Sequence, residues 1–315
     1  MTNFTMSYNI SAADIAYFEF ESIIGFVLPI LYGLTIPIGV LGNLFVIIVV
    51  CSQRQKRNTT DILIVNLAVV DFLFIMMYVP YIVTTYFKGS WVFGDIVCKL
   101  SNYIFCVSAT ISVYTLVLMS LDRYLAIVHP ITSTQFRTKK NFNLVVFITW
   151  LIVYGSYLPV IFETHKFGES VCSMSLTSTT RLMACFLFFA YVLPLLPICF
   201  FYGVILKQLL YGVVPGHSRS AISMKPMKRV AKRILVVVIV FVLCWLPYHL
   251  MNMFILFGDF DNYILISIIL STSRFLSFAN SCINPILYTF LSTKYRQSLR
   301  NLLCCKRPRP NNLNR

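Results

Sequence analysis

The chain has 315 residues, of which 58% are hydrophobic and only 12% are charged, and its mean hydropathy is +0.79. An ordinary soluble domain carries about 25% charged residues, so the composition excludes a soluble enzyme, a disordered protein and a secreted disulfide scaffold. The formal net charge of +15 would also suit nucleic-acid binding. The basic residues, however, flank apolar blocks, so we expect no nucleic-acid partner.

Seven apolar blocks, each of 21 residues or more, follow one another along the chain. A helix needs about 20 residues to cross a bilayer, and backbone groups in lipid must be satisfied within their own segment. None of the blocks shows the two-residue alternation of a barrel strand. Each is therefore predicted to be a transmembrane helix, over residues 23–51, 61–87, 97–127, 143–163, 182–211, 230–257 and 263–291.

The distribution of charge predicts how the chain lies in the membrane. Of the 26 basic residues, 21 fall at one end of the predicted spans, and such an excess marks the cytoplasmic side. We expect an extracellular tail over 1–22 with no cleavable signal peptide, a membrane domain over 23–291, a short amphipathic eighth helix over 292–305 and a cytoplasmic tail over 306–315. The sequence thus predicts an all-α membrane protein, a seven-transmembrane helix bundle in the plasma membrane.

Two cysteines, Cys98 and Cys172, are placed at the outer, oxidising side by this orientation. We expect a disulfide that fixes the link after the fourth span over the mouth of the bundle. The alternative is two free external thiols.

Covalent modification is expected at both ends of the chain. Asn3 and Asn9 lie in Asn-X-Ser/Thr sequences outside the membrane and are predicted to be glycosylated. Cys304 and Cys305 follow the amphipathic stretch after the last span, where palmitoylation is typical. The alternative is that both remain ordinary reduced thiols.

One carboxylate lies inside a span. Asp71 is about ten residues into the second span, or roughly 15 Å along a helix, and an ionisable group at this depth indicates function. Other spans carry polar residues at comparable depth, and they are Asn43, Ser112, Asn280, Ser281 and Asn284. The cluster predicts either a bound small cation or water, or a hydrogen-bond network around a protonated carboxyl.

Several motifs occur in a fixed order on the spans. They are Gly42-Asn43, Leu67-Ala-Val-Val-Asp71, Ser120-Leu-Asp-Arg-Tyr124, Trp150, Pro194 with Tyr202, Cys244-Trp-Leu-Pro247 and Asn284-Pro-Ile-Leu-Tyr288. The set resembles the rhodopsin-like (class A) G-protein-coupled receptors from residue 25 to residue 305. Within that class, residues 112–131 and 280–285 look most like the allatostatin-A and galanin receptor group.

This resemblance implies a receptor, not an enzyme, that converts extracellular binding of a neuropeptide into activation of a heterotrimeric G protein. It also implies arrestin, a receptor kinase and membrane lipid as partners, and no cofactor apart from an allosteric sodium ion. The implied sodium ligands are Asp71, Ser112, Asn280 and Asn284. The implied coupling and switch residues are Asp122, Arg123, Tyr124, Tyr202, Phe241, Trp245, Pro247, Asn284, Pro285 and Tyr288. Relatives often carry an acid at the base of the sixth helix, but residues 225–230 contain none.

The outer half of the bundle points to the class of ligand. Receptors for amines resemble one another in carrying an aspartate where this chain has Phe105, and opsins carry a lysine in the seventh span, which here has none. A peptide with an aromatic side chain is expected instead. The candidate ligand residues are Tyr81, Asn102, Phe105, Tyr248, His249, Asn252 and Arg274. Helix packing is the alternative for the aromatics, and an internal ion pair with an acid such as Glu163 is the alternative for Arg274.

Two rival readings stay open. A receptor for another peptide, of the kisspeptin or somatostatin type, would share the class motifs. A seven-span transporter or channel would predict charge pairs along a pore and internal repeats, whereas the chain has one central acid and no repeat.

Overall fold

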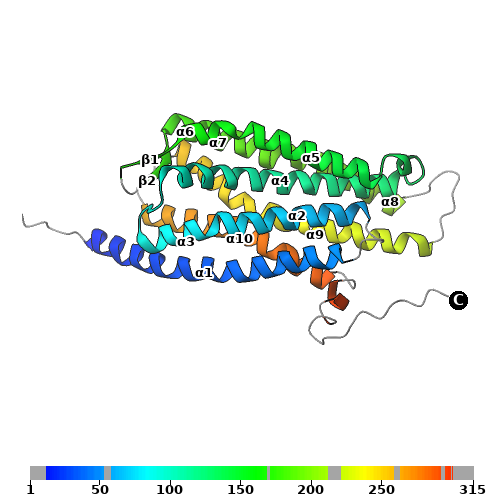
Figure 1. Cartoon of the computed structure of the whole chain (residues 1–315), viewed down its shortest axis with the longest axis horizontal. Coiled ribbons are helices and arrows are strands. Elements are labelled where there is room, and N and C mark those ends of the chain that lie inside the picture. Colours follow the sequence, from blue (N-terminus) through cyan, green and yellow to red (C-terminus); the bar gives the residue numbers. More distant parts are fainter. Residues whose placement is uncertain are drawn as a thin grey trace, which may run out of the picture.

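The computed structural model describes residues 12–52, 58–168, 171–211, 221–258, 263–291, 295–298 and 300. These residues include seven helical segments long and apolar enough to cross a membrane. The segments run side by side as a bundle (Figure 1). The predicted all-α fold with seven spans is therefore confirmed, and the chain is a multi-pass membrane protein.

Four of the spans are single helices and three are split. The single ones are α1 (Ala12–Cys51), α4 (Asp95–Val128), α9 (Ala221–Phe257) and α10 (Tyr263–Leu291). The split ones are α2 (Thr59–Met77) with α3 (Val79–Lys88), α5 (Lys139–Ser156) with α6 (Leu158–Glu163), and α7 (Leu176–Leu187) with α8 (Leu193–Tyr211).

The splits coincide with prolines. Pro80 lies in the first turn of α3 and Pro159 in the first turn of α6, where a missing N–H costs no helical hydrogen bond. A π-helical turn, Phe188–Val192, joins α7 to α8 just before Pro194. The breaks before α3 and α6 lie toward one end of the bundle, and that end holds the larger part of the candidate site, whereas the π-helical turn lies in the middle of its span.

A β-hairpin connects α6 to α7. Strand β1 (Thr164–Phe167) pairs antiparallel with β2 (Val171–Met174), at the end of the bundle where α4 begins (Figure 1). We call this the hairpin end, and the opposite one the Arg123 end. Strands of four residues are too short to show an alternation of apolar and polar residues. This segment was therefore predicted only as a link between the fourth and fifth spans.

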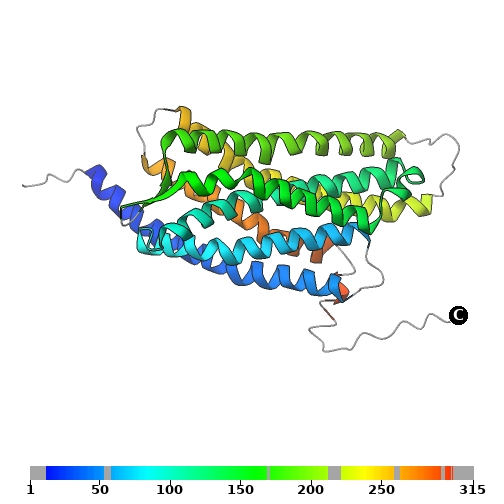
Figure 2. The same cartoon turned by 45° about the horizontal axis from the view of Figure 1, so that its top comes forward.

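The central helix of the bundle is α4. In the most apolar stretch of the span formed by α4, 72% is buried inside the protein. The corresponding share is 17% for the span formed by α5 and α6. Figure 2 shows α4 running among the other helices. Large apolar side chains such as Leu41 on α1 and Ile152 on α5 are each 65% exposed, as expected for surfaces that face lipid rather than a protein core.

Close packing holds α1 against α2 and α10. A Cβ atom on Gly39 would lie 2.3 Å from Cδ1 of Ile75 and 2.8 Å from Sγ of Cys282, so a larger residue would push these two side chains aside and glycine allows the close approach of the helices. The side-chain amide of Asn43 donates to the carbonyl oxygens of Gly39 (2.9 Å) and Ser281 (3.0 Å). The Gly42-Asn43 motif region is therefore a helix-packing element.

The two ends of the chain are described only in part. Helix α1 begins at Ala12, before the predicted start of the first span at residue 23. Residues 295–298 and 300 are helical, and the rest of the predicted eighth helix stays a prediction. Cys304 and Cys305, like Asn3 and Asn9, lie outside the described residues.

Candidate functional site

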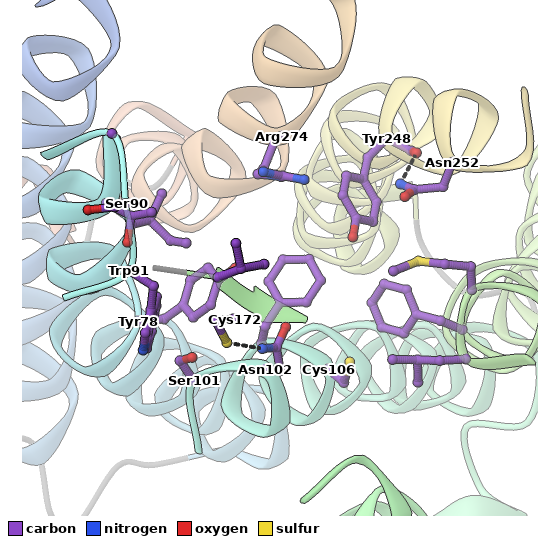
Figure 3. A pocket seen from close by; sticks show the side chains of 18 residues that line it. Tyr78, Ser90, Trp91, Ser101, Asn102, Cys106, Cys172, Tyr248, Asn252 and Arg274 are labelled. Atoms are coloured by element: carbon purple, nitrogen blue, oxygen red, sulfur yellow. Dashed lines mark hydrogen bonds between the residues drawn. The ribbon is translucent and has the colours of Figure 1, made fainter. Parts of the chain in front are cut away.

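A cavity of about 360 Å³ opens at the hairpin end. Its lining comes from α3, α4, α7, α9, α10, strand β2 and the residues joining α2 to α3 and α3 to α4. Figure 3 shows Arg274 and Tyr248 facing the same space, with Asn102 and Cys172 across from them. Five of the seven predicted ligand residues line it, namely Asn102, Phe105, Tyr248, Asn252 and Arg274.

The hairpin covers this cavity because it is tied to α4 twice. A disulfide joins Cys98 to Cys172, with the Cα atoms 5.7 Å apart, and the predicted bridge is thus present. The backbone N–H of Lys166 donates to Oδ1 of Asp95 at 2.8 Å. The amide of Asn102 also donates to Sγ of Cys172 at 3.4 Å. Strand β2 is therefore held as the roof of the cavity.

Phe105 forms the floor of the cavity and is only 6% exposed. Its ring centroid lies 5.8 Å from that of Trp245 on α9, and Trp245 lies 5.9 Å from Phe241 one turn further along. The buried indole N–H of Trp245 has no hydrogen-bond partner among the described residues, so aromatic packing alone holds this ring. A continuous line of rings thus joins the cavity to the middle of α9.

Arg274 brings the cavity a positive charge without a matching acid. None of the described lining residues is an aspartate or glutamate, and no described group forms a salt bridge with the guanidinium. Its electrostatic neighbours are the phenol groups of Tyr86, Tyr248 and Tyr78. The alternative pairing with Glu163 is wrong, because Glu163 pairs with Arg181 at 3.3 Å.

Two of the predicted ligand residues do not line the cavity. Tyr81 lies on another face of α3, where its ring packs edge-on against Phe93 at 4.8 Å. His249 is buried between Tyr191 (4.8 Å) and Phe186 (5.3 Å), on the α7 side of α9. The position of these two residues in the sequence indicates how far along the bundle axis they lie. Whether a side chain reaches the cavity depends on which face of its helix it occupies, which the sequence did not indicate.

Other lining residues were missed by the sequence analysis. Tyr78, Trp91 and Phe186 all border the cavity. Tyr78 lies at the break before α3, Trp91 in the link before α4, and Phe186 in the last turn of α7. For Tyr78 the sequence offered one signal, an aromatic residue close to the proline that begins the next helix. Trp91 and Phe186 have no comparable signal.

In the middle of the bundle, Asp71 is held by α10. Its Oδ1 accepts from the hydroxyl of Ser281 (2.7 Å) and its Oδ2 from the amide of Asn284 (2.8 Å). Ser112 is buried but forms no hydrogen bond with Asp71 among the described residues. Of the implied sodium ligands, the structure thus joins Asp71 to Asn284 directly, and Ser281, which was not among them, forms the second hydrogen bond to the carboxylate.

Spare oxygen acceptors lie on α10 near this carboxylate. The side-chain oxygens of Asn280 and Asn284 are buried and have no hydrogen-bond partner among the described residues. Carboxylate, amide and hydroxyl oxygens are the ligands that hard cations prefer, and an unpaired buried acceptor is costly unless an ion or water satisfies it. The donor set therefore fits a small cation.

At the Arg123 end, Asp122 collects donors from several elements. It is fully buried and accepts from Nε of Arg123 (3.1 Å) and Nε of Arg137 (3.0 Å). The hydroxyls of Thr59 (2.7 Å) and Thr60 (2.8 Å), at the start of α2, donate to its two oxygens. The Asp122–Arg123 pair was predicted, but the two threonines and Arg137 were not.

The implied switch residues Tyr124 on α4 and Tyr202 on α8 form different hydrogen bonds. The hydroxyl of Tyr202 donates to the backbone oxygen of Ala231 at 3.2 Å, which joins α8 to α9. Tyr124 instead packs against Phe201 at 5.1 Å, and its hydroxyl lies 3.2 Å from Nε2 of His129. Both tyrosines also pack against the buried cluster of Ile127, Ile205 and Ala231, which joins α4, α8 and α9.

The switch residues on the last two spans have local contacts. Pro285 lies against α1, since a Cβ on Gly42 would be 3.0 Å from the proline Cβ. Tyr288 packs on Tyr295 at 6.1 Å, and its buried hydroxyl has no partner among the described residues. Pro247 follows Trp245 within α9. These contacts place Pro285 against α1 and Tyr288 against Tyr295, and they form no direct contact with Arg123 among the described residues.

Comparison with known proteins gives the family. Residues 42–288 match the family described as 7 transmembrane receptor (rhodopsin family). The chain is 36% identical over 298 residues to the allatostatin-A receptor of Bombyx mori, covering 91% of this chain and 82% of that protein. It is 33% identical over 289 residues to galanin receptor type 1 of Mus musculus, with coverage of 89% and 82%. Against galanin receptor type 2 of Homo sapiens the identity is 32% over 281 residues, with coverage of 88% and 72%. The chain belongs to the rhodopsin family of seven-transmembrane receptors.

Proposed function

We propose that this chain is a plasma-membrane receptor for a neuropeptide of the allatostatin-A or galanin type, and that it activates a heterotrimeric G protein. The observation that carries the proposal is the line of rings from Phe105 through Trp245 to Phe241. It connects a cavity at one end of the bundle to the helix that borders the Arg123 end. The relatives, which are named as receptors for these peptides, support the ligand class.

The hairpin end is the outer end in this proposal. Its disulfide is of a kind that persists in an oxidising compartment. Lys139 and Lys140 begin α5 at the other end, and Lys228, Arg229 and Lys232 lie near the start of α9, as the excess of cytoplasmic basic residues requires. The N-terminus is then extracellular and the C-terminus cytoplasmic.

The ligand is expected to insert only one end into the cavity. A volume of about 360 Å³ is near the lower limit for a small-molecule site, so a peptide would place only a short terminal part inside it. An aromatic side chain would pack on Phe105 and Tyr248, and a carbonyl or carboxylate would accept from Arg274. A cationic amine is disfavoured because the described lining carries no acid.

Activation is a shift between two states of the bundle. A ligand that binds the active state better moves the equilibrium by its difference in affinity. Contact with Phe105 displaces Trp245, and the adjoining turn of α9 carries that displacement toward Ala231, where Tyr202 now binds. Arg123 then leaves Asp122, and Tyr202 and Tyr288 rearrange around it as the G protein enters.

A sodium ion is proposed as an allosteric ligand of the resting state. Asp71, Ser281, Asn280 and Asn284 would hold it, together with the buried hydroxyl of Ser112 on α4. The ion supplies a positive charge that keeps the buried carboxylate ionised. Asp71 thereby keeps α2 bonded to α10 through Ser281 and Asn284.

Further partners follow from the same proposal. Arrestin and a receptor kinase would act on the active state, and palmitoyl groups on Cys304 and Cys305 would attach the chain after the last span to membrane lipid. Asn3 and Asn9 would carry glycans on the extracellular side. Glycosidase treatment and labelling with a palmitate analogue, compared with Asn→Gln and Cys→Ser variants, test these assignments.

The proposal is tested in transfected cells that carry a G-protein dissociation sensor. Peptides of the allatostatin-A, galanin, kisspeptin and somatostatin types are applied, and the Arg123→Ala variant at equal surface expression is the control. We expect a saturable response to an allatostatin-A or galanin-type peptide that the control lacks. A response to a kisspeptin or somatostatin-type peptide alone would assign another ligand. Solute flux without any G-protein response would assign a transporter.

A further inference from the structure

A second cavity, of about 540 Å³, lies on the side of the bundle between α4, α5 and the π-helical turn Phe188–Val192. Its lining includes Thr110 and Tyr114 from α4, Thr149, Ile152, Val153 and Ser156 from one face of α5, and Phe189 from the turn. It shares no lining residue with the cavity at the hairpin end. We call it the lateral cavity, and the proposed function does not use it.

The lateral cavity is open toward lipid. Ile152 and Phe189, which border it, are 65% and 49% exposed, and α5 belongs to the span whose most apolar stretch is only 17% buried. Tyr114 lies near the middle of α4, a depth that falls in the hydrocarbon core of a bilayer about 30 Å thick. A ligand must therefore enter this cavity from within the membrane.

Most polar groups of the lateral cavity already have partners. The hydroxyls of Thr149 and Ser156 donate to carbonyl oxygens of their own helix, at 2.8 Å and 3.0 Å. The hydroxyl of Thr110 donates to the Cys106 carbonyl at 2.8 Å and lies 2.9 Å from the Tyr157 hydroxyl. The described lining carries no charged side chain, so the cavity suits a neutral, largely apolar molecule.

Tyr114 is the lining hydroxyl group that has no hydrogen bond among the described residues. The side chain is partly buried, and an O–H donor left unsatisfied at this depth costs free energy because the hydrocarbon core holds no water. A carbonyl oxygen inside the cavity would accept from it. Phospholipid ester groups lie in the interfacial regions outside that core, so the acceptor belongs to a molecule dissolved in the core itself.

From these observations we propose that the lateral cavity binds a neutral lipophilic carbonyl compound that enters from the bilayer core, with Tyr114 donating to its carbonyl oxygen. A volume of about 540 Å³ lies within the range of small-molecule sites, and such sites combine an apolar lining with few placed polar groups. The apolar part of the ligand packs on Ile152, Val153 and Phe189.

The lateral cavity shares a wall with the cavity at the hairpin end. Tyr157 lines the lateral cavity and packs edge-on against Phe186 at 6.4 Å, and Phe186 lines the other cavity. Thr110 is bonded to the carbonyl of Cys106, which also lines the other cavity. A ligand in the lateral cavity therefore changes peptide affinity, and in this respect the inference rests on the proposed function.

The binding test uses the full-length protein in nanodiscs without any peptide. The probe is a long-chain dialkyl ketone that carries a diazirine and an alkyne, and the control probe is the matched alkane with CH₂ in place of the carbonyl. Mass spectrometry of fragments locates the label after illumination. We expect saturable labelling of α4, α5 and the π-helical turn. One hydrogen bond should let the ketone reach half-saturation at a concentration at least about fivefold below that of the alkane.

Substitutions test the hydrogen bond and the cavity separately. Tyr114→Phe keeps the ring and should remove the difference between the two probes. Ser156→Phe and Thr149→Phe each place a ring in the cavity and should abolish saturable labelling by both probes. Leu151→Phe is the matched control, because it adds the same ring at a residue of α5 that is 58% exposed and does not line the cavity. It should leave labelling unchanged.

Two results would overturn the site. Equal half-saturation of the wild type by ketone and alkane would remove the role of Tyr114, and labelling that persists in both Ser156→Phe and Thr149→Phe would place the probe elsewhere. A photoreactive phosphatidylcholine is tested in parallel. If it alone labels these helices, phospholipid chains occupy the cavity and the proposed ligand class is wrong.

The coupling of the two cavities is measured by peptide binding. Saturating ketone should change peptide affinity by at least about fivefold, and saturating peptide should change ketone affinity by the same factor. Unchanged affinities would overturn the coupling, whereas the labelling experiment decides the site. Labelling requires neither peptide nor G protein, so a protein that binds the ketone but responds to no peptide would refute the proposed function and leave the lateral site intact.

Discussion

Phe105 and Trp245 pack with their ring centroids 5.8 Å apart and their planes at 48°. The first ring belongs to α4 and lines the cavity, and the second belongs to α9 and does not line it. A ligand that displaces Phe105 therefore acts on α9 through one contact.

Replacing Phe105 tests the floor of the cavity. Phe105→Ala is expected to lower peptide potency by at least about tenfold, because it removes the ring that the ligand and Trp245 share. Dose–response curves at matched surface expression give the measurement, and Phe105→Leu repeats it with most of the core volume retained. Phe87→Ala, which removes a ring that is 70% exposed at the same end, should leave potency unchanged. Normal potency in both Phe105 variants would exclude this residue from the pocket.

Arg274 is predicted to hold an acceptor group of the peptide. Arg274→Gln should weaken peptide binding by about tenfold, the cost of one charge-assisted hydrogen bond. Competition binding on membranes provides the measurement. The matched control is Arg181→Gln, which removes an exposed arginine that is paired with Glu163. Equal affinity of the wild type and Arg274→Gln would contradict the assignment.

Replacing either cysteine of the disulfide should have the same effect on peptide binding as replacing both. Cys98→Ser and Cys172→Ser should each abolish high-affinity binding, and the double variant should be no worse than either, since both break the same bond. Cys185→Ser, an exposed free cysteine on α7, serves as the control. Additive losses would show that the two cysteines act separately.

Sodium is expected to oppose agonist binding through Asp71. Agonist affinity of the wild type should fall when potassium is replaced by sodium at constant ionic strength, and Asp71→Asn should remove this dependence. Because Ser281 rather than Ser112 bonds to the carboxylate, Ser281→Ala should reduce sodium sensitivity more than Ser112→Ala. The same sodium dependence in Asp71→Asn and the wild type would argue for a purely structural network.

Arg123 is predicted to act only in coupling. Arg123→Ala should eliminate G-protein activation while surface expression and antagonist binding persist, because the side chain lies at the end of the bundle opposite the cavity. Flow cytometry and a G-protein sensor measure the two properties in the same cells. Unchanged signalling would refute the role.

The sequence predicted the spans closely because lipid imposes a strong constraint on length and polarity. The second predicted span, for example, runs from residue 61 to 87, and the structure has helix over Thr59–Met77 and Val79–Lys88. The pairing of Cys98 with Cys172 followed because both lie on the oxidising side. These features depend on position along the bundle axis alone.

The features that were missed depend on rotation around that axis or on distant pairing. His249 lies one residue after Tyr248, yet it faces Tyr191 while Tyr248 faces the cavity. Thr60 and Asp122 are 62 positions apart and meet only after α2 and α4 pack. Neither relationship leaves a local pattern in a single sequence. The polar pair Thr59-Thr60 beside a charged motif at the same depth was the one available hint.

The double attachment of the hairpin to α4 has a kinetic consequence. Because Cys98–Cys172 and Asp95–Lys166 join β2 and β1 to the first turn of α4, we expect the hairpin and this turn to move together. The cavity is also lined by α3, α7, α9 and α10, and no disulfide ties the described parts of these helices to the hairpin. In the proposed receptor, the residence time of a bound peptide would then depend on how these four helices open, so receptors with the same lining but different outer turns there would hold one peptide for different times.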